Sequence, residues 1–354
     1  MQPACLPNIW NRKNNKKEYN KTMICKNIYA LVIGCACLSA TATAATAWET
    51  LGLNGNVMTY SRLKKGANGL ELTHKYTFDK NGLLVNVEDK TKGENISYKY
   101  NAEGEEVLRI TTNAEGLLKD SAVTTYNYNK KKKHTTTKQY DETKKMVKAD
   151  DKWFDDDKRL MKHREIVIGQ EGILHGYHYA DDGEKEIITR FFDDEPDGSL
   201  EKTYDEKHNF ILEVDLDEKR RPISRTTRTF NKKGIKTSET VETFCLAVFN
   251  GKTTRQYDKK GLLVKEEIFD KNNQLRIGRS IVYDKKGHIL EENYTDGRKT
   301  TYAYDKAGNL TEKTDNSADG KAHIQQFSYD SLGNMTKHTN GNEETEFQYV
   351  YFTK

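Results

Sequence analysis

The sequence predicts an all-β protein: an antiparallel meander of β-hairpins that forms an extended, twisted or spiralling sheet. One observation is a turn motif that recurs along the chain, in which an aromatic residue is followed by Asp or Asn, two polar residues, Gly and an aliphatic residue. The other is composition, because the 354 residues are 35% hydrophobic and 32% charged, too polar for a large conventional core. Such a chain folds most easily as thin repeated units that each bury a little surface against their neighbours.

The chain begins with a segment typical of a signal peptide. The apolar stretch 28–38 follows several Lys and Arg residues and precedes an Ala/Thr run, and it is too short to cross a bilayer. We predict a signal peptide over residues 1–47, cleaved after Ala47, with Met23 as a second candidate start. Two alternatives remain open: lipid anchoring through Cys35, and a buried N-terminal helix. We therefore expect an exported protein that is periplasmic, at the cell surface or secreted, with no integral membrane span in the mature chain.

Removal of residues 1–47 changes what the composition implies. It takes away six Lys or Arg residues and one Glu, so the mature chain is nearly neutral and gives no general reason to expect nucleic-acid binding. It also leaves Cys245 without a partner for an intrachain disulfide. Cys245 lies in the most apolar segment, 244–249, which we interpret as a core strand with an inert buried thiol.

The recurring motif has a mechanical reason. Asp or Asn at the first turn position accepts a hydrogen bond from the backbone two residues on, and Gly three residues on takes the positive φ that closes the hairpin. The clearest copies place these two residues at Asp79 and Gly82, Asp258 and Gly261, Asp284 and Gly287, Asp305 and Gly308, and Asp330 and Gly333. Looser copies start at Tyr140, Phe154, Tyr204 and Phe269. Asn-Gly and Asp-Gly pairs at 250–251, 296–297 and 340–341 predict further hairpin turns.

The clarity of the motif divides the mature chain into three segments. Residues 48–119 carry N-terminal repeats, 120–229 a degenerate and charge-rich stretch, and 230–354 the clearest repeats. In the middle segment we expect the strands to persist with longer, solvated corners. No Pro/Gly-rich linker separates the segments.

These units resemble YD repeats, the tandem element of Rhs and teneurin-type surface proteins. The resemblance is clear over 230–335 and fair over 78–118. It implies a β-sheet that spirals into a shell, associated with carbohydrate binding or with enclosure of a toxic C-terminal domain. This chain is short for a closed shell and stops at Lys354, so we expect a short form without a toxin domain.

Potential metal sites have simpler explanations. His163, His175, His178 and Asp181 form the densest histidine cluster, but His175 and His178 face opposite sides of a strand, so we interpret them as scattered surface residues. Segments 193–204 and 315–326 partly match a calcium loop and lack its bidentate Glu at position 12. We predict no metal site and no cofactor, with calcium at these loops as the alternative.

Catalytic motifs are missing from the sequence. We find no nucleophile elbow, zinc-protease, Walker or dinucleotide motif, and we predict that the chain is not an enzyme. A carboxylate-dependent hydrolase that uses Asp155 or Asp156 is an alternative, although this acidic run favours ionised side chains in water. The lysines at 130–133 are typical of a solvated surface, and we predict no nucleic-acid partner.

Aromatic side chains are the best candidates for ligand binding. Tyr and Phe at each corner can present ring faces to sugars. Most rings must pack against neighbouring strands, and the candidates for stacking on a ligand are Tyr257, Tyr283, Tyr302, Tyr304 and Tyr329.

Three functional hypotheses follow. The first is a non-enzymatic scaffold or binding surface at the bacterial cell envelope, with a glycan or an envelope protein as partner. The second is a shell or accessory component of an Rhs-like toxin delivery system, with a polypeptide partner. The third is the hydrolase. We also expect self-association, because an open sheet leaves exposed edges.

Overall fold

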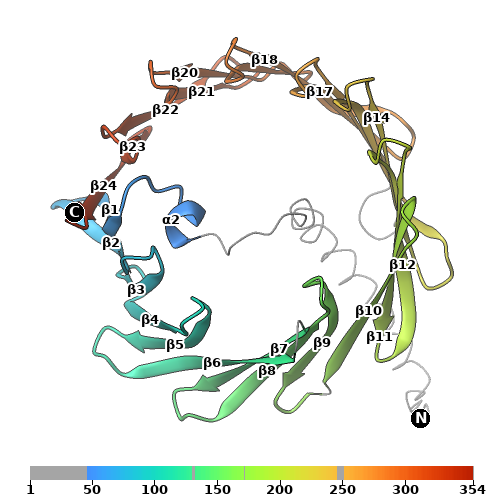
Figure 1. Ribbon diagram of the computed structural model, residues 1–354. Coiled ribbons are helices and arrows are strands. Elements are labelled where there is room, and N and C mark those ends of the chain that lie inside the picture. Colours follow the sequence, from blue (N-terminus) through green and yellow to red (C-terminus); the bar gives the residue numbers. More distant parts are fainter. Residues whose placement is uncertain (1–45, 130–131, 171, 245–250, 354) are drawn as a thin grey trace, which may run out of the picture.

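The computed structural model describes residues 46–129, 132–170, 172–244 and 251–353. Over these residues the chain forms one sheet of 24 antiparallel strands and a short helix, α2 (Ala47–Thr50) (Figure 1). The first twelve strands are β1 (Val57–Gly66), β2 (Gly69–Phe78), β3 (Leu84–Asp89), β4 (Glu94–Tyr100), β5 (Glu106–Asn113), β6 (Leu118–Asn129), β7 (Lys132–Asp141), β8 (Met146–Phe154), β9 (Leu160–Val167), β10 (Ile173–Asp181), β11 (Lys185–Phe192) and β12 (Glu195–Tyr204). The others are β13 (Phe210–Leu216), β14 (Pro222–Phe230), β15 (Lys236–Thr243), β16 (Gly251–Tyr257), β17 (Leu263–Asp270), β18 (Leu275–Tyr283), β19 (Ile289–Tyr294), β20 (Lys299–Tyr304), β21 (Leu310–Asn316), β22 (Ala322–Tyr329), β23 (Met335–Asn340) and β24 (Glu343–Tyr351).

The sheet closes on itself. Each strand pairs with its sequence neighbours, and β1 also pairs with β24, with Tyr60 opposite Tyr349. The predicted all-β antiparallel meander is confirmed, but the extended open sheet is wrong, because the strands form a complete ring (Figure 1). Closure also removes the reason given for self-association, since the two edge strands satisfy each other's backbone groups.

The recurring motif forms hairpin corners. Asp79 Oδ1 accepts hydrogen bonds from the backbone N–H groups of Asn81 and Leu83, both at 2.9 Å, and Gly82 has φ +79°. The other clear copies, at Asp258, Asp284, Asp305 and Asp330, also follow even-numbered strands, so these corners share one end of the ring. The looser copies at Tyr140 and Phe269 follow β7 and β17 and therefore lie at the opposite end.

The middle segment keeps its strands and short corners. Lys158 and His208 take the place of Gly, each with φ 63°, and their N–H groups bond to the carbonyls of Asp155 and Asp205 at 3.1 and 2.8 Å. The longer corners expected in this segment are therefore absent at these two positions. The three segments distinguished in the sequence belong to one continuous sheet in the described part of the chain.

Apolar burial is sparse. Among the described residues the buried hydrophobic side chains are Val57, Phe78, Val87, Ala122, Ala149, Leu216 and Ile281, and buried polar residues are more numerous. The ring is therefore held mainly by strand pairing and cross-strand side-chain contacts. Of the predicted core strand 244–249, Phe244 is 40% exposed, and Cys245 lies outside the described residues.

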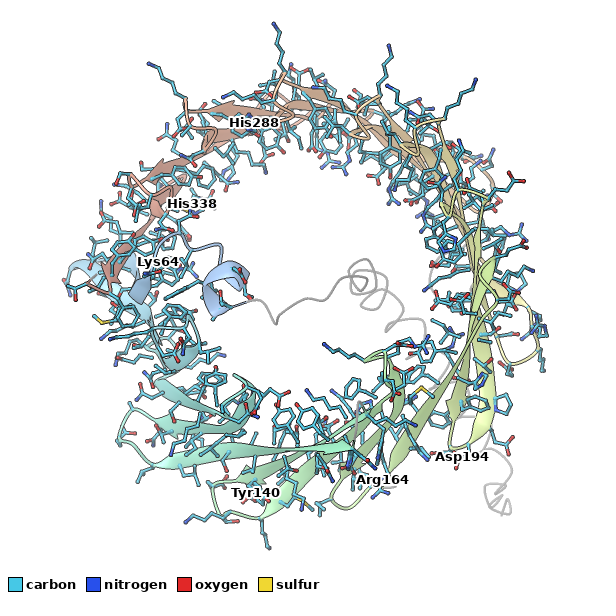
Figure 2. The ribbon with its side chains drawn as sticks, in the orientation of Figure 1. Lys64, Tyr140, Arg164, Asp194, His288 and His338 are labelled. Carbon is cyan, nitrogen blue, oxygen red and sulfur yellow. The ribbon has the colours of Figure 1, made fainter. Side chains whose placement is uncertain are left out.

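The two faces of the sheet can be assigned as inner and outer. Helix α2 lies inside the ring (Figure 1), and the Trp48 ring is 6.4 Å from that of Phe78, which is 2% exposed. Phe78 and Tyr76 share one face of β2 by the alternation of side chains, so this face is the inner one. Strand register then carries the assignment around the ring and returns consistently to Tyr60. Tyr140 and Arg164, which fall on the other face, lie on the outer side in Figure 2.

Candidate functional site: the inner wall of the ring

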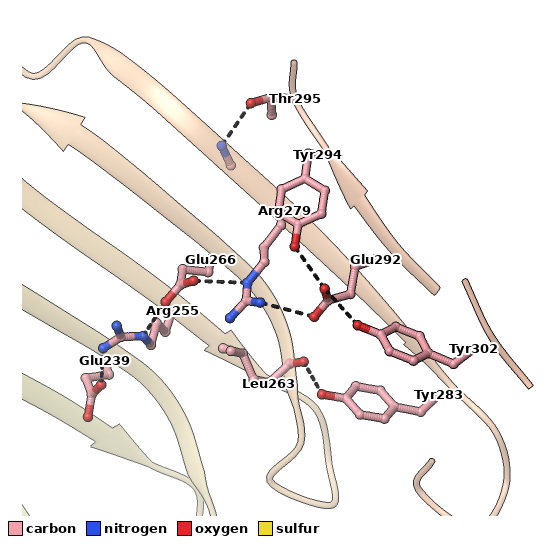
Figure 3. A network of polar contacts seen from close by, with 11 residues as sticks. Glu239, Arg255, Leu263, Glu266, Arg279, Tyr283, Glu292, Tyr294, Thr295 and Tyr302 are labelled. Atoms are coloured by element: carbon pink, nitrogen blue, oxygen red, sulfur yellow. Dashed lines mark hydrogen bonds and ion pairs between the residues drawn. The ribbon is translucent and has the colours of Figure 1, made fainter. Parts of the chain in front are cut away.

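One sector of the inner wall is a ladder of alternating charges. It runs across strands β14 to β19, and we call it the charged ladder: Arg228, Glu239, Arg255, Glu266, Arg279 and Glu292. The first five residues lie directly opposite one another on successive strands. Figure 3 shows how Arg255 and Arg279 each bridge two carboxylates.

The contacts in the ladder are close. Arg255 Nε is 2.7 Å from Glu266 Oε1, and Arg255 Nη1 is 2.8 Å from Glu239 Oε1. Arg279 Nε is 3.0 Å from Glu266 Oε2, and Arg279 Nη1 is 3.1 Å from Glu292 Oε1. Charge-assisted hydrogen bonds of this kind are strongest when both partners are fixed and partly shielded from water.

The ladder lowers the pKa of Glu239. Burial alone would raise the pKa of Glu239, but hydrogen bonds and charges from Arg255, Lys236 and Arg228 hold that pKa below its ordinary value. At the other end, Glu292 accepts hydrogen bonds from the hydroxyls of Tyr294 and Tyr302 at 2.9 and 3.3 Å. Burial and the Glu292 charge raise the pKa of Tyr302. From Glu239 to Glu292 the groups of the ladder thus pair with one another, whereas Arg228 Nη1 is buried without a hydrogen-bond partner among the described residues.

A second sector lies where the ring closes. We call it the aromatic seam: Tyr60 of β1, Tyr76 of β2, and Phe347 and Tyr349 of β24. The Tyr60 ring lies 5.3 Å from Tyr76, 5.4 Å from Tyr349 and 6.0 Å from Phe347. The three rings are stacked on Tyr60, so aromatic contact joins the first and last strands. Burial raises the pKa values of Tyr60 and Tyr349.

The N-terminal segment bridges the same closure. Residues 46–56, which we call the strap, pass from Trp48, whose indole N–H donates to the Val57 carbonyl at 2.8 Å, to Asn54. The Asn54 N–H donates to Asn334 Oδ1 at 2.7 Å, and Asn334 Nδ2 donates to the Asn54 carbonyl at 2.9 Å. Asn334 Nδ2 also contacts the Tyr351 hydroxyl at 2.9 Å. The strap thus ties the β22–β23 corner to β1 across the seam.

Several tyrosine hydroxyls donate hydrogen bonds to backbone carbonyls of the neighbouring strand. The Tyr100 and Tyr283 hydroxyls donate to the carbonyls of Leu84 and Leu263, both at 2.7 Å. The same bond recurs from Tyr126 to Glu106, Tyr179 to Leu160 and Tyr349 to Met335. In each case the acceptor stands five residues after the Asp or Asn that begins the preceding corner. The position of the acceptor relative to its corner is therefore constant, whereas the donating tyrosine stands 14 to 20 residues beyond the acceptor.

The five candidate stacking aromatics are half-buried, and most have partners within the wall. Lys236 Nζ lies 4.3 Å from the Tyr257 ring centre, and the His288 ring lies 4.8 Å from that of Tyr304. Tyr283 and Tyr302 make the bonds given above, and burial raises the pKa of Tyr329. Glycan binding by these rings stays a prediction.

Part of the histidine cluster does come together. His163 of β9 lies opposite His175 of β10 on the inner face, with ring centres 6.2 Å apart. Asp150 Oδ1 is 2.9 Å from His163 Nε2, and Glu165 lies opposite Asp150. His178 lies opposite Thr189 on the outer face, as the alternation predicted. Sequence reasoning missed Asp150 and Glu165 because strand register, which local patterns do not fix, aligns them with His163.

The calcium-loop matches do not form loops. Asp193 Oδ1 accepts from the Leu174 N–H at 3.2 Å, while positions 200 and 204 lie within β12. In the second match, Lys313 Nζ is 2.7 Å from Asp315 Oδ2 and Lys321 Nζ is 2.9 Å from Asp319 Oδ2. Lysines therefore neutralise the two carboxylates of this match.

In the acidic run at the β8–β9 corner, Asp155 stabilises the turn. Asp155 Oδ1 accepts from the N–H groups of Asp157 at 3.0 Å and Arg159 at 2.8 Å. Burial alone would raise the pKa of Asp155, but these bonds and the Arg159 charge lower it, opposite to what a general acid needs. Asp156 is exposed. The geometry thus gives the hydrolase hypothesis no support at these residues.

The lysine run is only partly described. Residues 130 and 131 lie outside the described part of the chain. Lys133 Nζ is 2.6 Å from Glu105 Oε1 and 4.7 Å from the Tyr126 ring centre. This lysine is already paired with a carboxylate.

No helix in the described part of the chain has the length and apolar character needed to cross a bilayer.

Comparisons with known proteins bear on the repeats. Residues 283–322 match the family model described as RHS Repeat, which confirms the resemblance to YD repeats. Similar solved structures include a Tc holotoxin pore from Photorhabdus luminescens, with 11% identity and a TM-score of 0.29 over 82% of this chain and 18% of that chain. A crystal structure of TcdB2-TccC3 has 10% identity and a TM-score of 0.22, over 81% and 21%.

A porin-like protein from Bacteroides uniformis has 9% identity and a TM-score of 0.22, over 84% of this chain and 98% of that chain. This chain spans about a fifth of the length of the two toxin chains above. No curated protein sequence matches it.

Proposed function

We propose that this chain is a non-enzymatic shell that encloses a polypeptide guest, as a component of an Rhs-like toxin delivery system. The observation that carries the proposal is the pairing of β1 with β24, which turns the repeats into a closed wall with an inner and an outer face. The RHS repeat at residues 283–322 supports it, because enclosure of a polypeptide is one of the roles associated with such repeats.

The ring is wide enough for a guest. With 24 strands spaced about 4.8 Å apart, its circumference is about 115 Å and its backbone diameter about 37 Å, before strand tilt widens it. Side chains about 5 Å long on the inner face leave a width of about 25 Å, part of which helix α2 occupies, against about 10–12 Å for an α-helix. In Figure 2 the described side chains line the ring without reaching across its middle.

The chemistry of the wall also suits enclosure. From Glu239 to Glu292 the charged ladder is paired within itself, and the rings of the aromatic seam stack on one another. Sectors whose groups are engaged with one another in this way can surround a guest without fixing it in one pose. We therefore propose that the guest is retained mainly by the closed geometry.

The setting is proposed from the sequence. The signal-like segment within residues 1–47 supports an exported protein, periplasmic, secreted or at the cell surface, with or without a lipid at Cys35. Glycan binding at the cell envelope is the competing function.

Protection from protease tests the shell. The full chain is co-expressed with the polypeptide encoded by the adjacent gene, and the complex is treated with protease. We expect the guest to be protected by the wild-type chain and to be cut when Tyr60→Asp places a charge in the aromatic seam. Gln348→Asp, which adds the same charge on the outer face, is the matched control and should leave protection intact.

Two results would overturn the proposal. One is a guest that is cut equally fast with and without the chain. The other is glycan-array binding by the chain alone that disappears on Tyr257→Ala or Tyr329→Ala, which would favour the envelope-binding function instead.

A further inference from the structure

The inner wall carries a cluster of metal-ligand side chains away from the charged ladder and the aromatic seam. Asp150, His163 and Glu165 each place one ligand atom within 4.8 Å of the others. They come from the adjacent strands β8 and β9, and His175 lies on the next strand. From this juxtaposition we infer a site for Zn²⁺, with Asp150, His163 and Glu165 as ligands and His175 as the fourth.

The donor set fits zinc. Zinc takes imidazole nitrogen and carboxylate oxygen in tetrahedral sites, and two imidazoles with two carboxylates neutralise its charge. Two imidazoles on one tetrahedral zinc have ring centres about 5 Å apart, given a Zn–N bond of about 2.1 Å. The observed His163–His175 separation is 6.2 Å, so binding requires one ring to move about 1 Å toward the other.

The backbone positions these groups before any ion arrives. Asp150 lies directly opposite Glu165, and His163 directly opposite His175, so register alone brings all four to one face. Asp150 Oδ1 is 2.9 Å from His163 Nε2, a contact that fixes the ring near the carboxylate. A rigid sheet loses little conformational freedom when it binds an ion, which favours affinity.

A lysine now compensates the two carboxylates. Lys148 Nζ lies 2.8 Å from Glu165 Oε1 and 3.5 Å from Asp150 Oδ2. The Lys148 side chain is 30% exposed, so it can swing into water when a dication replaces its charge. The site therefore contains its own competitor, and removal of that competitor should tighten binding.

Calorimetric titration of the full chain with ZnCl₂, after dialysis against chelator, tests the site. We expect one zinc per chain, and His163→Ala should weaken binding at least about tenfold. His178→Ala is the matched control, because His178 lies on β10 but faces outward. Lys148→Met should strengthen binding several-fold, an effect that a merely structural cluster would not produce.

A second readout separates loss of the site from loss of fold. Tetrahedral Co²⁺ bound in place of zinc gives a visible absorption band, which should be present in His178→Ala and absent in His163→Ala, while both keep the wild-type circular dichroism spectrum. The inference is overturned if wild type binds no zinc at micromolar concentration. It is also overturned if His178→Ala weakens binding as much as His163→Ala, or if Lys148→Met weakens it.

Discussion

The charged ladder and the aromatic seam occupy the same inner face, yet they are built from opposite chemistry. In the ladder, guanidinium and carboxylate groups alternate across six strands. Each pair of neighbouring strands is joined by one ion pair. At the seam, four rings stack across three strands, where the first strand meets the last. Paired charges stabilise the ladder, and packed aromatic rings stabilise the seam.

The difference follows from how each sector forms. Apart from β15 and β16, whose connection lies largely outside the described residues, neighbouring strands of the ladder are joined by short corners, so these pairings are local and little chain entropy opposes them. The seam joins strands from the two ends of the described chain, and no corner holds them together. Ring stacking contributes more per residue than a partly exposed ion pair, which suits the one junction that has no covalent help. The strap adds hydrogen bonds from Asn54 to Asn334 at the same place.

Extremes of pH should separate the two sectors most strongly, because the pKa shifts of Glu239 and Tyr60 have opposite directions. The pKa of Glu239 is lowered, so its contribution to stability is complete above the ordinary value of 4.5 and is lost as pH falls through the folded value. The pKa of Tyr60 is raised, so its contribution is complete below the ordinary value of 10.0 and is lost as pH rises through the folded value. Low pH should therefore destabilise the ladder, and high pH should destabilise the seam.

Circular dichroism across the pH range, on wild type and two variants, checks this. Tyr60→Phe keeps the ring and removes the ionisable hydroxyl, so the alkaline midpoint should rise while the acid midpoint stays. Glu239→Gln should flatten the acid branch and leave the alkaline branch unchanged. If both variants move the same branch, the two sectors are not electrostatically distinct.

Truncation of the central seam ring should cost more than loss of an outer-face ring or of a ladder arginine. Tyr60→Ala removes three stacking contacts at once, and we expect a loss of about 3 kcal/mol in unfolding free energy, measured by urea denaturation. Tyr140→Ala on the outer face is the control and should cost less than half as much. Equal losses would mean that the seam rings are no more important than any other tyrosine of the sheet.

The ladder should respond to a smaller degree and in a salt-dependent way. Arg279→Met leaves Glu266 and Glu292 without their shared guanidinium, and we expect a loss of about 2 kcal/mol, reduced by partial exposure of the arginine. A double-mutant cycle with Glu266→Gln measures the coupling. That coupling should shrink in about 1 M NaCl, whereas the coupling between Tyr60 and Tyr349 should not change. A salt-independent ladder would contradict the role given to its charges.

The sequence predicts local features of this fold well. The Asp79–Gly82 and Asp330–Gly333 corners follow from turn chemistry that is complete within five residues, and the antiparallel meander follows from the corners. Closure of the ring does not follow from the corners. The contact of Tyr60 with Tyr349 depends on the curvature accumulated over the whole sheet, which no short segment encodes. An open sheet is therefore the natural expectation from local patterns alone.

The site residues also divide into those that local patterns predict and those that depend on strand register. The alternation rule correctly separates His175 from His178. Pairs such as Asp150 with Glu165 depend on cross-strand register, which the corners set only after the whole hairpin is built. A charge ladder leaves a sequence signal, since its Arg and Glu residues recur at one position of successive strands, but the signal is visible only once register is known.

The smallest effect concerns the tyrosine hydroxyls that serve the backbone. Tyr283→Phe removes the 2.7 Å bond to the Leu263 carbonyl and should cost about 1 kcal/mol in urea denaturation. Tyr257 ends the preceding even-numbered strand, and no hydroxyl hydrogen bond of Tyr257 occurs among the described residues, so Tyr257→Phe should cost close to nothing. The pair keeps both rings and changes only the hydroxyl. If the two losses are equal, the bond from tyrosine to the carbonyl contributes no stability of its own, and these tyrosines act on the sheet through ring packing alone, as the rings of the seam do.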